Sequence, residues 1–558
     1  MQSDLIANHK DRIHAELLLA RLRQLDGEDA ATSLDQADDA IARLESRLAD
    51  VSLSDAALVR ESDAHRESAV LYLALASGLG DEERIFRAMQ LANISELARR
   101  QDFARDGSDQ DGDAQTLRNE LLDLARQQAE LSARLDQARI DATDTAGELT
   151  AELASVAGLQ QVAERALLEE HPDFVARYRP VPVALADLRT RLGADEILVA
   201  PVEGDLQGWL VRVSADGVAS HALEMDNIAA SVATLRAAVD APQTLASFPQ
   251  EEAHALFAAL FPDGVAGVDR VLVYGGRSLA TLPLGMLVTE AYTGDLRRAP
   301  WLARMVGSQT IGNLALFSRA DAQSQTEAGR RFVGVGGIAL PGSDGGERLA
   351  GLFRSGRPDA TTIADLPELP GAAGELNRIA ASFPPSARTL MIGPDASEAR
   401  FKAADLQDIA VLAFATHGLV AGELADLWEP ALLLRPGEGD SGDDGLLGAS
   451  EIAGLAIDAD WVILSACNTA AGSSPGAPSF GGLAAAFAQA GARSLLLSHW
   501  RVRDDAAAYL SARTVEIAAQ GRDRAEALRQ AQVELMENRT VADAGHPSVW
   551  APFILIEN

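Results

Sequence analysis

The sequence has a single cysteine, Cys467, among its 558 residues. One cysteine cannot form a disulfide within the chain, so the fold must depend on apolar residues, which make up 47% of the sequence. A free thiol that is kept as a nucleophile suits a reducing cytosol, where disulfides are rare. The thiol therefore needs an explanation other than a bridge.

Positive charge is also scarce, with 48 Lys and Arg against 82 Asp and Glu and a net charge of −34. Phosphate backbones bind through Lys and Arg, so a nucleic-acid partner is not expected. No apolar run reaches about 18 residues, and the first thirty residues lack the apolar centre of a signal peptide. We therefore expect a soluble, cytoplasmic protein without a membrane partner. The glycine and lysine phosphate loop of nucleotide-driven switches is absent as well.

The length predicts roughly two to four domains, and the first of them is helical. Residues 1–105 are rich in Ala, Leu, Glu and Arg, with Leu17, Leu18, Leu22 and Leu25 at helical spacing. This pattern favours stacked helical pairs. Clean consensus positions of a 34-residue tetratricopeptide period are missing, so any such repeat is degenerate.

A polar segment over residues 106–113 predicts an acidic linker. Its aspartates and Glu120 have part of the spacing of a calcium loop. Ala114 stands where the sharp turn of that loop needs glycine, so a solvated hinge is the better interpretation and no metal is expected. The leucines that follow recur at steps close to three and four, which predicts a long coiled-coil-like helix over 114–172. Packing within the chain and packing against another copy both remain open.

From about residue 180, short apolar runs alternate with helical segments, which is typical of an α/β fold. We divide this part into a first α/β subdomain, 180–325, and a second, 326–558. Strands are predicted at 196–202, 208–213, 271–274, 331–338, 388–392, 409–416, 431–434, 461–466, 493–498 and 552–556, with helices at 372–382, 480–490 and 505–519.

Two of these strands end in reactive groups. His417 and Gly418 follow the run at 411–416, and Cys467 follows the run at 461–466. Parallel strands bring their carboxyl ends to one rim of a sheet, where the thiol and the imidazole can meet. A neighbouring His can activate the thiol as thiolate, and the N–H groups of Gly418 and Cys467 can receive an oxyanion. The alternative is an inert buried thiol and a structural imidazole.

Several motifs of the chain resemble, in order, the CHAT family of caspase-like cysteine peptidases. The resemblance covers roughly residues 180–558 and is carried by Leu282-Pro-Leu284, Ala415-Thr-His-Gly418, Leu464-Ser-Ala-Cys-Asn-Thr469, Phe480-Gly-Gly482, Gln489-Ala-Gly-Ala-Arg493, Ser498-His-Trp500 and His546-Pro-Ser-Val-Trp-Ala-Pro-Phe553.

This resemblance implies a caspase-like α/β sheet with helices on both faces, behind an all-α region with a coiled-coil-like arm. It implies Cys467 as nucleophile, His417 as general base and acid, and the N–H groups of Gly418 and Cys467 as the oxyanion hole. No metal or cofactor is implied. The family often carries tetratricopeptide repeats ahead of the peptidase, and the helical first 170 residues resemble the end of such an array rather than a complete one.

The substrate pocket is less well defined by the resemblance. Ser465 stands two residues before the nucleophile, where caspases have Gln. Trp500 and Arg501 resemble a caspase pocket wall that favours an acidic P1 residue, the residue before the cut bond. Asp504 and Asp505 resemble an acidic pair that would accept Arg or Lys instead. We favour a basic or apolar P1 residue, and a simple surface ion pair explains these charges equally well.

The sequence therefore predicts a regulated cysteine endopeptidase that cuts a specific protein or peptide partner, with the helical N-terminal region binding a regulatory protein. The family resemblance extends to bacterial stress or antiviral defence, with a gasdermin-type target. The alternative is a non-catalytic, caspase-like scaffold that acts through its helical region.

Overall fold

A computed structural model describes most of the chain. The described residues are 2–27, 30–50, 55–93, scattered helical positions between 116 and 138, 145–171, 182–205, 207–240, 242, 244–319, 331–338, 369–420, 427, 429–436, 443–465, 482–500 and 502–557. The predicted linker at 106–113, Cys467 and Arg501 lie outside them. No helix within these ranges is long and apolar enough to cross a membrane.

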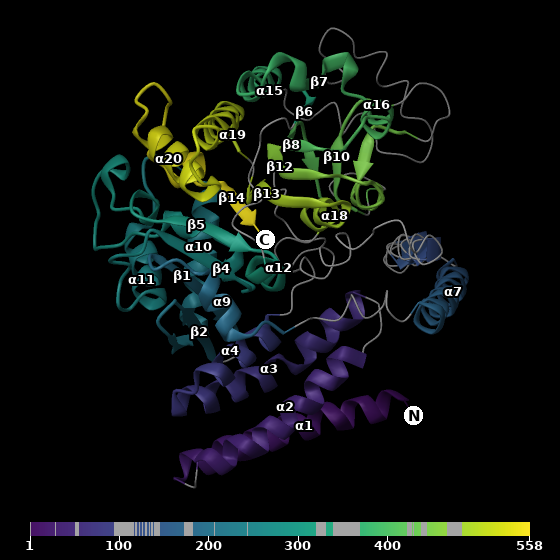
Figure 1. Cartoon of the computed structure of the whole chain (residues 1–558), viewed down its shortest axis with the longest axis vertical. Helices are drawn as coiled ribbons and strands as arrows, with labels where there is room; N and C mark the ends of the chain where they lie inside the picture. Colours follow the sequence, from purple (N-terminus) through teal and green to yellow (C-terminus); the bar gives the residue numbers. More distant parts are fainter. Residues whose placement is uncertain are drawn as a thin grey trace.

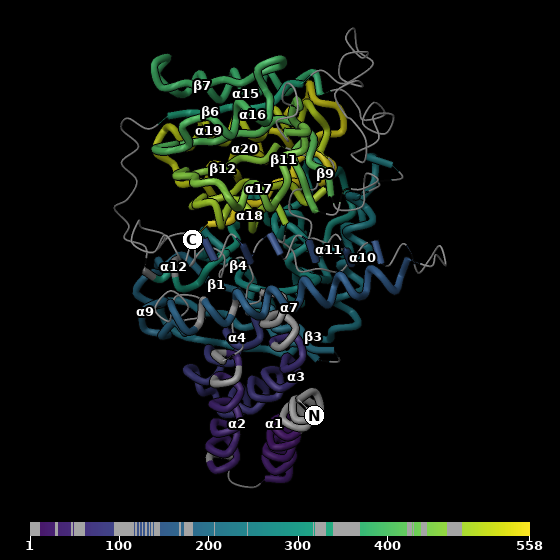
Figure 2. The backbone as a smooth tube through the Cα atoms, turned by 90° about the vertical axis from the view of Figure 1, so that its right-hand side faces the viewer, coloured from purple at the N-terminus to yellow at the C-terminus, as the bar shows by residue number. Residues whose placement is uncertain are grey.

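The N-terminal region is helical, as predicted. Its helices are α1 (Gln2–Leu25), α2 (Ala30–Asp50), α3 (Asp55–Leu79) and α4 (Glu82–Ala92). They lie at one end of an elongated molecule, and the second α/β half lies at the other end (Figures 1 and 2). Asp81 caps α4 by accepting a hydrogen bond from the N–H of Arg84 at 3.1 Å. The tetratricopeptide character of these helices stays a prediction.

The predicted single helix over 114–172 is wrong. Helix α7 (Ala146–Glu170) begins after a turn at Thr145, and buried residues from both sides of that turn share one small cluster, among them Leu135 and Leu149. The two helical segments therefore pack on each other within the chain. Asp and Thr residues precede Ala146, and their side chains compete with helical hydrogen bonds, which favours a helix start here over a continuous helix.

One eleven-stranded mixed sheet forms the centre of the rest of the chain. Its order is β3-β2-β1-β4-β5-β14-β13-β12-β8-β6-β7. The strands are β1 (Glu196–Val202), β2 (Gln207–Val213), β3 (Val218–Glu224), β4 (Arg270–Tyr274), β5 (Gly307–Ile311), β6 (Arg331–Gly336), β7 (Arg388–Ile392), β8 (Ile409–Ala415), β12 (Ala459–Ser465), β13 (Ala492–Ser498) and β14 (Phe553–Glu557).

The sheet contains two parallel blocks that point in opposite directions. Strands β1, β4, β5 and β14 run parallel to one another, and so do β13, β12, β8, β6 and β7. The blocks meet at the antiparallel pair β13 and β14. The carboxyl ends of β8 and β12 therefore lie at one rim, and those of β4 and β5 lie at the opposite rim.

Helices cover both faces of the sheet, which confirms the predicted fold class (Figure 1). Alternate strand residues contribute to opposite cores, as the two-residue period of a strand requires. One core lies under α10 (Met225–Asp240), α11 (Gln250–Leu260), α15 (Ala372–Ala381), α19 (Asp504–Ala518), α20 (Arg524–Glu537) and α21 (Pro547–Trp550). The opposite face holds α9 (Leu185–Arg191), α12 (Leu314–Arg319), α16 (Glu398–Lys402), α17 (Ala449–Ala453) and α18 (Leu483–Ala490).

The N-terminal helices are not separate from the sheet. Buried residues of α1 to α4 form one continuous core with residues of β1, β2 and β4, such as Leu198, Val211 and Leu272. Polar contacts add to this junction, because Asn93 donates to the carbonyl of Pro201 at 3.0 Å and accepts from the N–H of Gly276 at 3.1 Å. The helical region and the first α/β half are thus one structural unit.

The ten predicted strands are all present, with ends shifted by at most two residues. Strands β8 and β12 are apolar runs that are buried along their whole length because helices cover both faces of the sheet. The structure adds β3, β5, β9 (Gly418–Leu419) and β11 (Leu446–Gly448), and it places β10 (Ala431–Leu433), one of the predicted strands, between β9 and β11 in a second, three-stranded sheet.

Candidate active site

The two strands that lead to the predicted dyad are neighbours. β8 and β12 pair in parallel, with Ser465 in register with Ala415. Each predicted reactive residue, His417 or Cys467, follows its strand by two positions beyond this registered pair. Cys467 itself lies outside the described residues, so the described part of the site consists of His417, Gly418 and the groups around the end of β12.

His417 sits where the main sheet joins the small sheet. It is 5% exposed, and its carbonyl accepts a hydrogen bond from the N–H of Leu433 at 2.9 Å. The preceding Thr416 is also buried, and its hydroxyl donates to the carbonyl of Leu433. β10 therefore fixes the backbone at His417 from one side.

Gly336 lets the end of β6 approach the same turn. A Cβ atom at Gly336 would lie 2.0 Å from the carbonyl oxygen of Ala415, and its φ of +152° is one that favours glycine. The N–H of Gly337 donates to that same oxygen at 3.0 Å. The backbone before His417 is thus held from β6 as well as from β10.

Gly418 has an orientation that suits its predicted role. It lies opposite Leu432 in the antiparallel pair of β9 and β10. Positions in such a pair alternate between hydrogen-bonded and non-hydrogen-bonded, and the bond from Leu433 to His417 makes the next pair, Gly418 and Leu432, non-hydrogen-bonded. The N–H of Gly418 consequently points away from β10.

A buried carboxyl lies directly against the end of β12. The Ser465 hydroxyl donates to Oε2 of Glu375 at 3.1 Å, and the Ser511 hydroxyl donates to Oε1 of the same carboxyl. Glu375 belongs to α15 and is 3% exposed. It joins α15, α19 and β12 in one polar network inside an otherwise apolar core.

Burial raises the pKa of Glu375 to about 7, because removing a carboxylate from water disfavours its charged form. The hydrogen bonds from the two serine hydroxyls and the charge of Arg378 lower the pKa, whereas the charge of Asp504 raises it further. Glu375 was not among the residues predicted from the sequence. The signal was present, since a glutamate stands between Ala372, Leu376 and Ile379 on the face of α15 that the apolar spacing marks as buried.

The predicted pocket residues are scattered. Trp500 is 3% exposed, and its indole N–H donates to the carbonyl of Ser548 at 3.0 Å. Asp504 accepts from the N–H of Gly371 at 2.6 Å, at the start of α15. Asp505 is exposed and pairs with Arg503 at 2.5 Å, and hydrogen bonds from Arg503 lower its pKa. The structure therefore gives each of these three side chains a partner within the protein.

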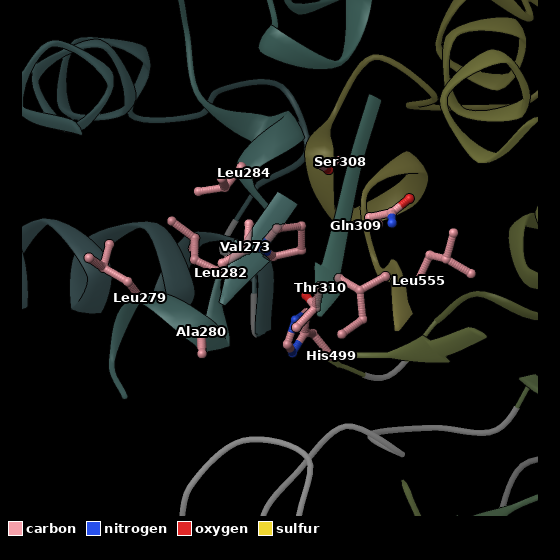
Figure 3. A pocket seen from close by; sticks show the side chains of 12 residues that line it. Val273, Leu279, Ala280, Leu282, Leu284, Ser308, Gln309, Thr310, His499 and Leu555 are labelled. Atoms are coloured by element: carbon pink, nitrogen blue, oxygen red, sulfur yellow. The ribbon is translucent and has the colours of Figure 1, made fainter. Parts of the chain in front are cut away.

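His499 lies at the same rim, after β13. It lines a cavity of about 30 Å³ between β4, β5 and the ends of β13 and β14 (Figure 3), which has room for about two water molecules. Leu279, Leu282 and Leu555 form much of the wall. Burial and then the charge of Arg236 lower the pKa of His499 to about 3, so its imidazole is neutral at pH 7. This cavity is too small for a peptide.

An acidic loop beside the small sheet is anchored to α16. Lys402 contacts Glu398 at 2.5 Å, Glu451 at 2.7 Å and Asp443 at 3.2 Å. Glu398 also accepts from the N–H of Gly445 at 2.7 Å. Within the described ranges, no group of three His, Cys, Asp or Glu residues could hold a metal ion.

No curated protein matches the chain. Among solved structures, the Arg-specific cysteine proteinase gingipain R is 10% identical, with a TM-score of 0.32, over 60% of this chain and 73% of that one. A complex of the pro- and mature domains of Porphyromonas gingivalis RgpB is also 10% identical, with a TM-score of 0.33, over 60% and 75%.

A family model described as the CHAT domain matches residues 250–558, which include both strands of the candidate site and all of the second α/β subdomain. This match agrees with the motifs quoted from the sequence. The chain belongs to the CHAT-domain family.

Proposed function

We propose that this chain is a cysteine endopeptidase with His417 and Cys467 as its dyad. The observation that carries the proposal is the register of Ser465 with Ala415 on adjacent parallel strands. Adjacent strands lie about 4.8 Å apart, and two further residues extend a chain by at most about 7 Å. The residues that precede the proposed dyad, Ala415 and Ser465, are thus neighbours on one rim, which supports the proposal.

The proposed reaction is acyl transfer. The Cys467 thiolate, formed with His417 as base, attacks the carbonyl carbon of the scissile peptide bond and gives a tetrahedral oxyanion. The N–H groups of Gly418 and Cys467 stabilise this oxyanion. His417 then protonates the leaving amine, and water hydrolyses the thioester to release the acid and restore the thiol. The direction of the Gly418 N–H, away from β10, supports its part in this scheme.

The lone cysteine makes the dyad simple to test. An alkylating reagent or a cysteine-reactive peptide probe can label only Cys467 in this chain. We expect labelling to vanish in Cys467→Ala and to fall sharply near neutral pH in His417→Ala, because the imidazole no longer favours the thiolate. His221→Ala is the matched control, since that imidazole binds the carbonyl of Ala259 far from the rim. Equal labelling of wild type and His417→Ala would contradict the dyad.

The rival function is a non-catalytic scaffold that acts through the helical N-terminal region. The helical region and the first α/β half share one continuous core, so a partner that binds the helices can affect the packing of that half. If Cys467 is alkylated no faster than free cysteine, with and without peptide substrate, the result would support the scaffold and contradict the peptidase.

Specificity remains a proposal that a peptide-library cleavage profile decides. Cleavage after Arg or Lys supports Asp504 and Asp505 as the pocket, which requires their present contacts with Gly371 and Arg503 to open. Cleavage after Asp supports Arg501. A defence role with a gasdermin-type target is proposed on the family resemblance alone.

A further inference from the structure

Glu375 is the one buried carboxyl that contacts both a strand of the dyad and a helix behind it, among the residues that the structure describes. Ser465, which binds one of its oxygens, precedes Cys467 by two residues. Ser511, which binds the other, lies on α19, 136 positions along the chain. Any change in this carboxyl therefore acts on the end of β12 directly.

The hydrogen bonds of Ser511 give the network two states. Its hydroxyl oxygen lies within hydrogen-bond distance of Glu375 and also 2.9 Å from the carbonyl oxygen of Ala507. A hydroxyl has one proton, so it makes only one full hydrogen bond as a donor. When Glu375 is neutral, its own O–H donates to Ser511, and the Ser511 proton goes to Ala507. When Glu375 is ionised, the Ser511 proton must turn to the carboxylate.

The charges near Glu375 are few. Among the described residues, Asp504 from α19 raises its pKa and Arg378 from α15 itself lowers it. The groups that contact it from β12 and α19, Ser465 and Ser511, are uncharged. Within the described part of the chain, the close partners of this buried carboxyl are therefore hydroxyl donors, which makes its protonation sensitive to pH near neutrality.

We propose that Glu375 is a positioning residue whose protonation state sets the end of β12 through Ser465 and thereby controls the reactivity of Cys467. This inference rests on the proposed function. The neutral network satisfies Ser465, Ser511 and Ala507 together. Ionisation removes the bond to Ala507 and adds a negative charge against Ser465, two residues before Cys467 in the chain, and a negative charge at the end of β12 opposes thiolate formation.

The test is the pH profile of single-site alkylation by iodoacetamide. Glu375→Gln reproduces the neutral network, because its amide NH₂ can donate to Ser511 and its oxygen can accept from Ser465. We expect this variant to react roughly fivefold faster than wild type at pH 8, where a nearby carboxylate holds back the thiol. The two rates should converge at pH 6. Ser511→Ala should also change the profile above pH 7.

Glu398→Gln is the matched control, since Glu398 is also fully buried but contacts Lys402 and Gly445 instead of β12. Superimposable profiles of Glu375→Gln and wild type would overturn the inference, and so would a lowered melting temperature with no change of profile. If Glu375→Gln does not fold, the profile of Ser511→Ala decides. His417→Ala, measured alongside, reports on the dyad, so failure of the proposed function is seen separately.

Discussion

Replacing Glu375 by Gln should change how the stability of the protein depends on pH. In the folded chain burial raises the pKa of this carboxyl from 4.5 to about 7. Between these values the folded protein keeps a proton that the unfolded chain has released. The stability associated with the neutral carboxyl is therefore fully present below pH 4.5 and is lost as the pH rises through 7.

The size of this effect follows from the width of the window. About 2.5 pH units at about 1.4 kcal/mol per unit give a loss of about 3 kcal/mol for wild type. Gln carries no titrating proton, so Glu375→Gln should gain about 3 kcal/mol relative to wild type between pH 4.5 and pH 8. Burial also raises the pKa of Glu398 to about 7, so this residue lowers the stability of wild type and of Glu375→Gln equally as the pH rises. The difference between the two curves isolates Glu375.

Urea denaturation followed by tryptophan fluorescence is a suitable assay, because Trp301 and Trp550 are fully buried and report on the core. The free energy of unfolding would be measured at pH 5, 6, 7 and 8 for wild type, Glu375→Gln and Glu398→Gln. A constant offset between wild type and Glu375→Gln at all four values would refute the reasoning. It would mean that Glu375 keeps the same protonation state in the folded and unfolded chains.

Three further predictions concern other parts of the molecule. Burial lowers the pKa of His499 from 6.5 to about 3, so the stability that the neutral imidazole contributes is present above pH 6.5 and is lost as the pH falls. The free energy of unfolding of His499→Gln, measured by urea denaturation, should therefore rise by about 2 kcal/mol relative to that of wild type between pH 6.5 and pH 5. Glu203 accepts the N–H groups of residues 277–279 and one hydroxyl. Glu203→Gln should lower the free energy of unfolding by about 2 kcal/mol in the same assay. The exposed control Glu251→Gln should change it by no more than about 0.5 kcal/mol, and equal losses in the two variants would contradict the prediction. Deleting residues 1–93 should expose the apolar face of β1, β2 and β4. We therefore expect the shortened protein to aggregate and to bind a hydrophobic dye. A soluble product that does not bind the dye would show that the α/β part folds alone.

The shared core also constrains how a partner could regulate the site. The N-terminal helices lie at the opposite end of the molecule from β8 and β12, with the first α/β half between them (Figure 2). Within the described part of the chain, the first α/β half therefore connects a protein bound to α1 with His417. The contact between the two blocks of the sheet, β13 with β14, is the route that the strand order offers.

Much of the α/β part was predictable from the residues alone. β8 and β12 are continuous apolar runs because both of their faces are buried, and such runs stand out in a sequence. β5, Gly307–Ile311, was missed because its polar residues Ser308, Gln309 and Thr310 hide it. β3 was missed because it is an edge strand with a mixed, half-exposed pattern.

The sequence by itself determined that two buried strands end shortly before His417 and Cys467, because a continuous apolar run indicates both the burial and the length of a strand. Only the tertiary structure decided what surrounds them. Glu375 and Ser465 stand 90 positions apart, and the pairing of β5 with β14 joins segments more than 240 positions apart. Contacts of this kind depend on how helices and strands pack in space, for which neighbouring residues carry no signal.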